Sequence, residues 1–210
     1  MTHNSYKVLF IVIAILFSNK IYAKGFDIEQ YQEYRAFPET SFLDLDTNQH
    51  LLEEFEGSGL LVVFWASWCD ICHNELPDLD LLQKKFIKKP LKIIALSEDF
   101  KGTEQVKEFY LQHNISYLDA YLDQKNTIFN QLNVTSLPTA FLVNKDGNIT
   151  AKLTGPINWQ ADEINQLLTD LIKDATHNYN KKPSKKQPEK PKNNFEVPEE
   201  AVTYIGVNNV

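Results

Sequence analysis

The pattern of apolar and polar positions divides this 210-residue chain into an apolar N-terminal run, a long region of alternating strand-like and helix-like segments, and a polar C-terminal stretch. Residues 60–65 form an apolar run without polar alternation, which is typical of a strand buried on both faces. Residues 24–38 show no clear period. The pattern predicts a hairpin at residues 41–46 and 49–51, a helical turn at 52–56, and then the order β-α-β-α-β-α-β-β-α at residues 60–65, 69–89, 91–96, 103–113, 115–121, 126–132, 139–143, 148–153 and 158–175.

This order predicts an α/β fold with a central mixed sheet and helices on both faces. Strands separated by helices are expected to be parallel. The last two strands, joined through Asp146-Gly147, are expected to form an antiparallel hairpin at the edge of the sheet. Thr103 and Asn158 are candidate N-caps of two helices, and Pro77 is expected to kink the helix that contains it.

The N-terminus has the composition of an export signal. Lys7 supplies a positive charge, residues 8–17 are ten consecutive apolar residues, and a cleavage site follows Ala23. The run is shorter than the about 20 apolar residues of a membrane span. A retained membrane anchor is the alternative, because Ile21 is not the small residue preferred near a cleavage site. We predict a signal peptide at residues 1–23 and an exported, periplasmic protein.

Charge is unevenly distributed along the chain. The formal net charge of −7 argues against nucleic acid as a general partner. Residues 24–177, predicted to form one domain, contain 13 basic and 24 acidic residues, a net charge of −11. Residues 178–210 are rich in Lys, Pro and Asn and predict a flexible tail. Within this tail, the stretch from Lys181 to Lys192 contains six lysines and one glutamate. This stretch is either a solvated linker or a segment that is attracted to an anionic membrane surface or to an acidic partner.

The chain has two cysteines, Cys69 and Cys72, placed between a buried strand and the following helix. Unpaired N–H groups at a helix N-terminus favour a thiolate, and the second cysteine lies one turn along, within reach of a disulfide. A bridge that closes so short a loop adds little stability, so we expect a reactive pair; an inert structural bridge is an alternative. A zinc half-site is another, although zinc needs about four ligands and no second cysteine pair exists. We predict no metal and no cofactor.

With these segments in place, the chain resembles the thioredoxin superfamily, and within it the TlpA/ResA-like exported thiol–disulfide oxidoreductases. The resemblance covers about residues 37–175 and is carried by residues 42–46, 61–77 and 134–147. Glu75, Pro77 and Pro138 stand at the places expected for this family. The resemblance implies a thioredoxin-like fold, a redox-active disulfide and a part in cell redox homeostasis.

The resemblance also implies roles for residues around the disulfide. Cys69 is expected to be the exposed nucleophile, and Cys72 the buried thiol that resolves the mixed disulfide. Pro138 resembles the cis-proline that faces the cysteines in this superfamily, which would leave the backbone of Leu137 free to pair with an extended substrate chain. An ordinary trans-proline is the alternative. Trp68 is expected to shield the sulfurs and to contact substrate.

Glu75 follows Cys72 by one helical turn and is expected to accept or relay a thiol proton; a solvated helix charge is the alternative. Val63 stands where thioredoxin has a buried aspartate, so this chain lacks that proton acceptor. Glu75 is therefore the stronger candidate for proton transfer. Asp70 should raise the thiol pKa values by repulsion, although a protonated His73 would oppose it. We predict a potential nearer that of thioredoxin (about −270 mV) than that of DsbA (about −120 mV).

These expectations favour a reductase that acts on the disulfides of protein partners. Electrons would come from a membrane thiol donor, and apocytochrome c is a substrate class that some relatives serve. A disulfide oxidase or isomerase on the same fold is one alternative, and a non-catalytic binding protein that uses the basic tail is another. Peroxidase chemistry is disfavoured, because the cysteine pair has dithiol-exchange spacing and Arg35 is the only arginine.

Overall fold

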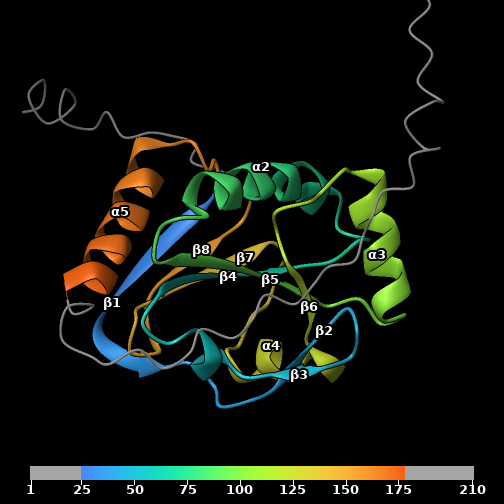
Figure 1. The fold of residues 1–210 in the computed structure, drawn as a ribbon, viewed down its shortest axis with the longest axis horizontal. Coiled ribbons are helices and arrows are strands. Elements are labelled where there is room, and N and C mark those ends of the chain that lie inside the picture. Colours follow the sequence, from blue (N-terminus) through green and yellow to red (C-terminus); the bar gives the residue numbers. More distant parts are fainter. Residues whose placement is uncertain (1–24, 178–210) are drawn as a thin grey trace, which may run out of the picture.

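A computed structural model describes residues 25–177; the predicted signal peptide and the lysine-rich tail lie outside the described residues. The described chain is built around one eight-stranded sheet in the order β1-β8-β7-β4-β5-β6-β2-β3 (Figure 1). The strands are β1 (Asp27–Ala36), β2 (Phe42–Asp44), β3 (Gln49–His50), β4 (Gly59–Trp65), β5 (Leu91–Ser97), β6 (Ala120–Leu122), β7 (Thr139–Val143) and β8 (Asn148–Thr154). The helices are η1 (Leu52–Phe55), α2 (Asp70–Phe86), α3 (Thr103–Gln112), η2 (Gln124–Asn126), α4 (Thr127–Gln131) and α5 (Asp162–His177), of which η1 and η2 are 3₁₀-helices. Within residues 25–177, no helix has the length and apolar character needed to cross a membrane.

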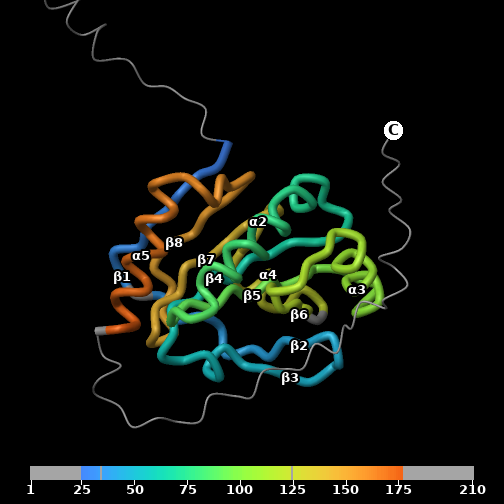
Figure 2. Tube along the Cα trace, turned by 45° about the horizontal axis from the view of Figure 1, so that its top comes forward, coloured from blue at the N-terminus to red at the C-terminus, as the bar shows by residue number. Residues whose placement is uncertain are grey.

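The sheet is mixed, as the sequence predicted. Strands β4, β5 and β6 are parallel, whereas β7, β8 and β1 continue the sheet antiparallel on one side. On the other side the β2–β3 hairpin pairs antiparallel with β6. Figures 1 and 2 place β1 and α5 together at one end of the sheet and the hairpin at the opposite end. This arrangement makes β4 a central strand.

Strand β4 is buried along its whole length and divides the core in two. Leu61, Val63 and Trp65 belong to a cluster that also contains side chains of α2, α3 and α5. The alternate residues Leu60 and Val62, followed by Phe64, belong to a second cluster with α4, because successive side chains of a strand point to opposite faces. The predicted helices on both faces are therefore present, with α2 above the sheet, α4 below it and α5 at its left end in Figure 1.

Strand β1 is the main element that the sequence did not predict, and it takes the edge position expected for β8. Most of its side chains are exposed, and Ile28 and Tyr31 are only half-buried. Its pairing with β8 is also irregular between Gln30 and Arg35. An edge strand of this kind buries too little apolar surface to show a period-two pattern.

Strand β6 is shorter than the predicted strand at residues 115–121. The reason lies in the buried Asp80 of α2, whose Oδ1 accepts hydrogen bonds from the backbone N–H groups of residues 116–118 at 3.0, 2.5 and 2.8 Å. These donors are satisfied by a side chain instead of a neighbouring strand. Sheet pairing therefore begins only at Ala120.

Helix α3 begins at Thr103, as predicted, but both predicted N-caps are wrong. The N-cap of α3 is Gly102, with φ +78°, and not Thr103, which is the first helical residue. Helix α5 begins at Asp162 instead of near Asn158. The Oδ1 of Asn158 accepts a hydrogen bond from the N–H of Gln160 at 3.1 Å, so its side chain closes a turn that precedes the helix.

The β2–β3 hairpin is closed by His50, whose ring nitrogens lie 2.8 Å from Glu54 Oε2 and 3.1 Å from Asp44 Oδ2. Burial alone would lower the pKa of His50, but hydrogen bonds to the two carboxylates outweigh it and raise the pKa. This stabilisation is complete below the unfolded pKa of about 6.5 and is lost as the pH rises through the folded pKa. We expect His50→Gln to lower the free energy of unfolding by about 1 kcal/mol at pH 5 and by less at pH 9, measured by urea unfolding. An equal loss at both pH values would contradict a charged His50 in the hairpin.

Candidate active site

The two cysteines lie where the central strand β4 leads into α2. Cys69 is the N-cap of α2, and Cys72 lies in the first turn. The sulfurs form a disulfide, with the two Cα atoms 5.3 Å apart, and Cys69 Sγ accepts a hydrogen bond from the N–H of Cys72 at 3.3 Å. Cys69 is largely buried in the disulfide, with 8% of its surface exposed instead of the exposed thiol that was predicted, and Cys72 is completely buried. An attacking sulfur can therefore reach Cys69 more easily than Cys72.

The loop before Cys69 is fixed from several directions. Ser67 donates its N–H and its Oγ–H to the carboxylate of Asp99 at 2.9 and 2.7 Å. A ring nitrogen of His73 lies 2.6 Å from the carbonyl oxygen of Ser67, and the N–H of Cys69 donates to the carbonyl oxygen of Ala66 at 3.1 Å. Because these contacts hold the loop, the position of the Cys69 sulfur is set before a partner arrives.

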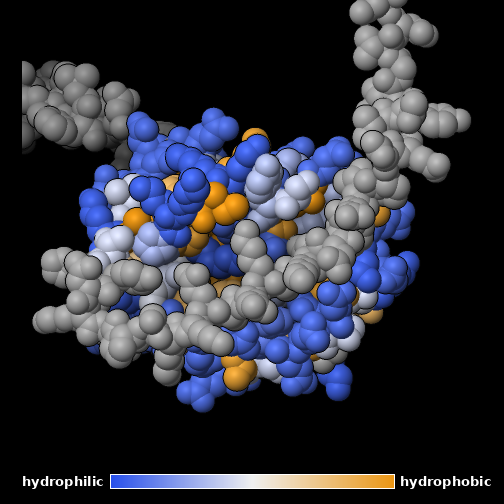
Figure 3. Space-filling view, viewed as in Figure 1, coloured by the Kyte–Doolittle hydropathy of each residue, from blue (hydrophilic) through white to orange (hydrophobic). Residues whose placement is uncertain are grey.

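Cys69 opens into a groove of about 560 Å³. The groove is lined by Trp68, Cys69, Asp70, Ile71, Glu98, Phe100, Asn126, Phe129, Thr135, Ser136 and Leu137. Trp68, Ile71 and Phe100 are among the few large apolar side chains that are exposed in the described chain, and Phe100 is 81% exposed. The face drawn in Figure 3 is mostly hydrophilic, with its most extensive hydrophobic areas between α5 and α2. Exposed apolar side chains beside a reactive sulfur suit the binding of a protein segment.

The loop before β7 forms the other side of this groove. The Leu137–Pro138 peptide bond is cis, as the resemblance implied. Leu137 lines the groove together with Cys69, and the carbonyl oxygen of Pro138 accepts a hydrogen bond from the N–H of Gly155 at 3.0 Å. Residues separated by almost 70 positions in the sequence are thus brought to one surface.

Glu75 is buried in α2, with 5% of its surface exposed, and so is not a solvated helix charge. Its Oε1 accepts a hydrogen bond from the N–H of Ile157 at 2.7 Å, while its Oε2 has no partner within residues 25–177. Burial raises the pKa of Glu75 to about 7, against the lowering effects of the Ile157 N–H and the nearby Trp159 indole. The indole N–H of Trp159 falls outside hydrogen-bonding geometry, so the Ile157 N–H has the larger lowering effect. Glu75 can therefore change protonation state near neutral pH.

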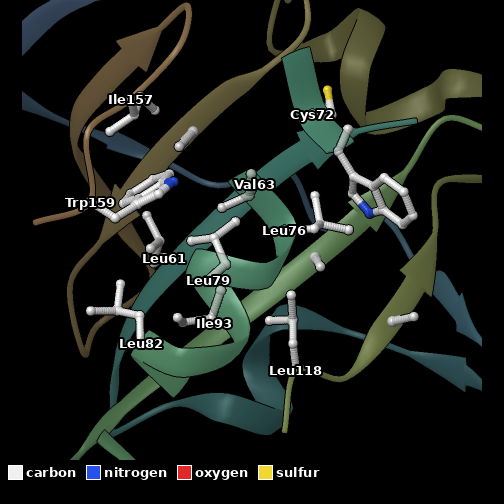
Figure 4. Close-up of a cluster of buried hydrophobic side chains, with 14 of the residues drawn as sticks. Leu61, Val63, Cys72, Leu76, Leu79, Leu82, Ile93, Leu118, Ile157 and Trp159 are labelled. Carbon is white, nitrogen blue, oxygen red and sulfur yellow. The ribbon is translucent and has the colours of Figure 1, made fainter. Parts of the chain in front are cut away.

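Figure 4 shows the apolar surroundings of the inner cysteine. Cys72 lies at the border of a cluster that includes Val63, Leu76 and Leu79, all of them buried. Val63, at the position of the buried aspartate of thioredoxin, is therefore an apolar core residue. Glu75 is the carboxyl group that α2 supplies in the turn after Cys72.

Glu98 is the site residue that the sequence reasoning missed. It follows β5 directly, is 2% exposed, and lines the same groove as Cys69. Burial and the neighbouring carboxylates of Asp123 and Asp99 raise the pKa of Glu98 to about 9. A signal was present in the sequence: an acidic residue immediately after a buried strand stands at the edge of the sheet where parallel strands end.

The predicted site residues therefore fall into three groups. Trp68, Cys69 and Leu137 line the groove, whereas Pro138 is buried and is not one of its lining residues. Cys72 and Glu75 lie beneath it in the buried part of α2. The arrangement places one sulfur at the wall of the groove and a second, fully buried sulfur with a titratable carboxyl group behind it, which suits dithiol exchange.

Comparisons with known proteins agree with this chemistry. A family model described as the AhpC/TSA family matches residues 34–152, more than half of the chain. The chain belongs to the AhpC/TSA family. Within this family it is similar to the thiol-disulfide oxidoreductase ResA of Bacillus cereus (strain ATCC 10987 / NRS 248), with 31% identity over 176 residues that cover 81% of this chain and 97% of ResA. ResA of Bacillus cereus (strain ZK / E33L) is 34% identical over 130 residues, covering 61% of this chain and 73% of ResA.

Solved structures extend the likeness of this AhpC/TSA-family chain to its fold. The thioredoxin domain of a thiol-disulfide oxidoreductase from Bacteroides vulgatus has a TM-score of 0.56 and 26% identity, covering 66% of this chain and 96% of that domain. A thiol:disulfide interchange protein of the thioredoxin family from Chlorobium tepidum TLS has a TM-score of 0.57 and 21% identity, covering 68% and 99%. The chain is thus a ResA-like thiol–disulfide oxidoreductase with a thioredoxin-like fold, as the sequence predicted.

Proposed function

We propose that this chain is an exported reductase that breaks disulfides of protein partners through the Cys69–Cys72 couple. The observation that carries the proposal is the unequal access of the two sulfurs, with Cys69 opening into an apolar-rimmed groove and Cys72 buried behind it. Cys69 attacks the partner disulfide, and Cys72 then attacks Cys69 to release the reduced partner. Leu137 and Trp68 would hold the partner segment across the groove.

Acidic groups around the pair support the reducing direction. Asp70 lies in the first turn of α2, and Glu75, whose pKa of about 7 leaves it partly charged at neutral pH, lies in the turn after Cys72. Their negative charge offsets part of the stabilisation that the helix N-terminus gives a thiolate, so the reduced form loses stability relative to the disulfide. A couple whose reduced form is less stable has a lower reduction potential and tends to reduce its partners.

The reduction potential tests the direction. Equilibration of the purified protein with glutathione redox buffers is expected to give a potential nearer about −270 mV than about −120 mV. A potential above about −180 mV, the value of protein disulfide isomerase, would instead identify an oxidase or isomerase.

Export is supported by the sequence outside the described residues, and the electron donor is proposed from the family resemblance. The apolar run at residues 8–17 and the cleavage site after Ala23 favour delivery to the periplasm. There a membrane thiol carrier would re-reduce the Cys69–Cys72 disulfide. The lysine-rich stretch at residues 181–192 would hold the protein near an anionic membrane surface, where such a donor lies.

A further inference from the structure

Glu98 is held firmly beside the cysteine loop. Its N–H donates to the carbonyl oxygen of Trp65, the last residue of β4, at 2.9 Å. The next residue, Asp99, accepts the two hydrogen bonds from Ser67 at 2.9 and 2.7 Å. The segment that carries Glu98 is thereby tied at two points to the segment that leads into Cys69, and both residues line one groove.

The carboxyl group of Glu98 makes no hydrogen bond in the part of the chain that the structure describes. Both of its oxygens are buried and lack a hydrogen-bond partner within residues 25–177. Asp99 differs, because it accepts hydrogen bonds from Ser67 and from the hydroxyl group of Ser97. The groove-lining residues include no lysine or arginine to neutralise a charge on Glu98. Such a carboxyl group keeps its proton at neutral pH, and burial accordingly raises the pKa of Glu98 to about 9.

We propose that Glu98 is the general acid that protonates the partner sulfur leaving when Cys69 attacks a disulfide in the groove. This inference rests on the proposed function. The Cys69 thiolate forms a bond to one partner sulfur, the partner S–S bond breaks, and its electron pair goes to the other sulfur. That sulfur takes the proton of Glu98, and the carboxylate left behind regains a proton from solvent.

Glu98 lines the groove in which the partner sulfur leaves. A general acid must hold its proton at the working pH and give it up as charge develops on the leaving group, and a leaving alkyl thiolate accepts a proton readily because a cysteine thiol has a pKa of about 8.5. Glu75 does not fit the role, because it does not line the groove and its Oε1 is bound to Ile157. Glu75 would then accept the proton of Cys72 on the enzyme, and Glu98 would donate a proton to the leaving sulfur of the partner.

The test compares leaving groups that do and do not need a proton. Cys72→Ala leaves Cys69 as the sole thiol, and its single-turnover reaction is followed with two neutral, symmetric disulfides. Bis(2-hydroxyethyl) disulfide releases an alkyl thiolate that needs a proton, whereas 4,4′-dithiodipyridine releases a stable aromatic thiolate. Adding Glu98→Gln is expected to slow the alkyl reaction by about 10²-fold, the lower range for general acid catalysis, and to leave the aromatic reaction within about twofold.

Controls separate this role from a structural one. Glu104→Gln, which changes an exposed carboxylate at the start of α3, should change neither rate. If Glu98→Gln does not fold, Glu98→Leu removes the same proton and should show the same selectivity. Equal slowing of both reactions, or no slowing of either, would overturn the role of Glu98. If Cys72→Ala with Glu98 intact reacts with neither disulfide, the proposed function fails first.

Discussion

Replacing Cys69 by Ser is expected to lower the rate of insulin disulfide reduction by more than about 10³-fold, the scale of losing a catalytic nucleophile. A hydroxyl group cannot attack a disulfide at neutral pH, and the remaining thiol, Cys72, is completely buried. The measurement is the turbidity of reduced insulin with dithiothreitol as electron source. Residual activity of more than a few per cent would contradict the assignment of Cys69 as the nucleophile.

The matched variant Cys72→Ser should fail differently. Cys69 remains at the surface of the groove, so the first attack still occurs, but no second sulfur resolves the mixed disulfide. When the pre-reduced variant is mixed with insulin without dithiothreitol, which would itself cleave the mixed disulfide, covalent adducts are expected to accumulate, visible on a non-reducing gel. If adducts form with Cys69→Ser and not with Cys72→Ser, the roles of the two cysteines are reversed.

Replacing Glu75 by Gln is expected to stabilise the protein and to impair it. The pKa of Glu75 rises from 4.5 to about 7 on folding, so the folded state disfavours its charged form. The resulting penalty is absent below pH 4.5, grows between pH 4.5 and 7, and is complete above pH 7. Glu75→Gln keeps an oxygen for the Ile157 N–H and should raise the free energy of unfolding by about 2–3 kcal/mol at pH 8, with little change at pH 4.

The same variant should lose a step in the pH profile of resolution. If the Glu75 carboxylate takes the proton of Cys72, resolution of the mixed disulfide in the wild-type protein speeds up as the pH rises through about 7. In Glu75→Gln this step disappears, and resolution at pH 8 falls by about 10²-fold. Glu108→Gln, an exposed carboxylate on α3, is the control. An unchanged pH profile in Glu75→Gln would leave Glu75 with a structural role only.

The sequence predicted the centre of the fold better than its edges. Strand β4 is buried along its whole length, so its apolar run was unambiguous. Strand β1 lies at an edge and is largely exposed, so its sequence carries no clear alternation. The length of β6 depends on Asp80, which lies more than 30 residues away in the sequence and takes up backbone donors that would otherwise pair. Such long-range hydrogen bonds leave no local pattern.

The candidate site shows the same division. The spacing of Cys69 and Cys72 at a strand-to-helix junction was sufficient to predict a disulfide, and the resemblance led to Glu75 and to the cis bond before Pro138. Glu98 was missed because its burial arises only when the ends of β4, β5 and β6 meet. The position of Glu98 directly after a buried strand marks it as a candidate, but a glutamate after a strand is usually a solvated charge, and its burial follows from tertiary contacts.

The most direct test of the account is the pH dependence of iodoacetamide alkylation of the fully reduced protein, with each cysteine followed separately by mass spectrometry. The account predicts that Cys69 is alkylated first, with a midpoint below the value of about 8.5 for a free cysteine, while Cys72 stays unmodified in the folded protein. Equal alkylation of both cysteines, or a Cys69 midpoint at or above that of free cysteine, would contradict it.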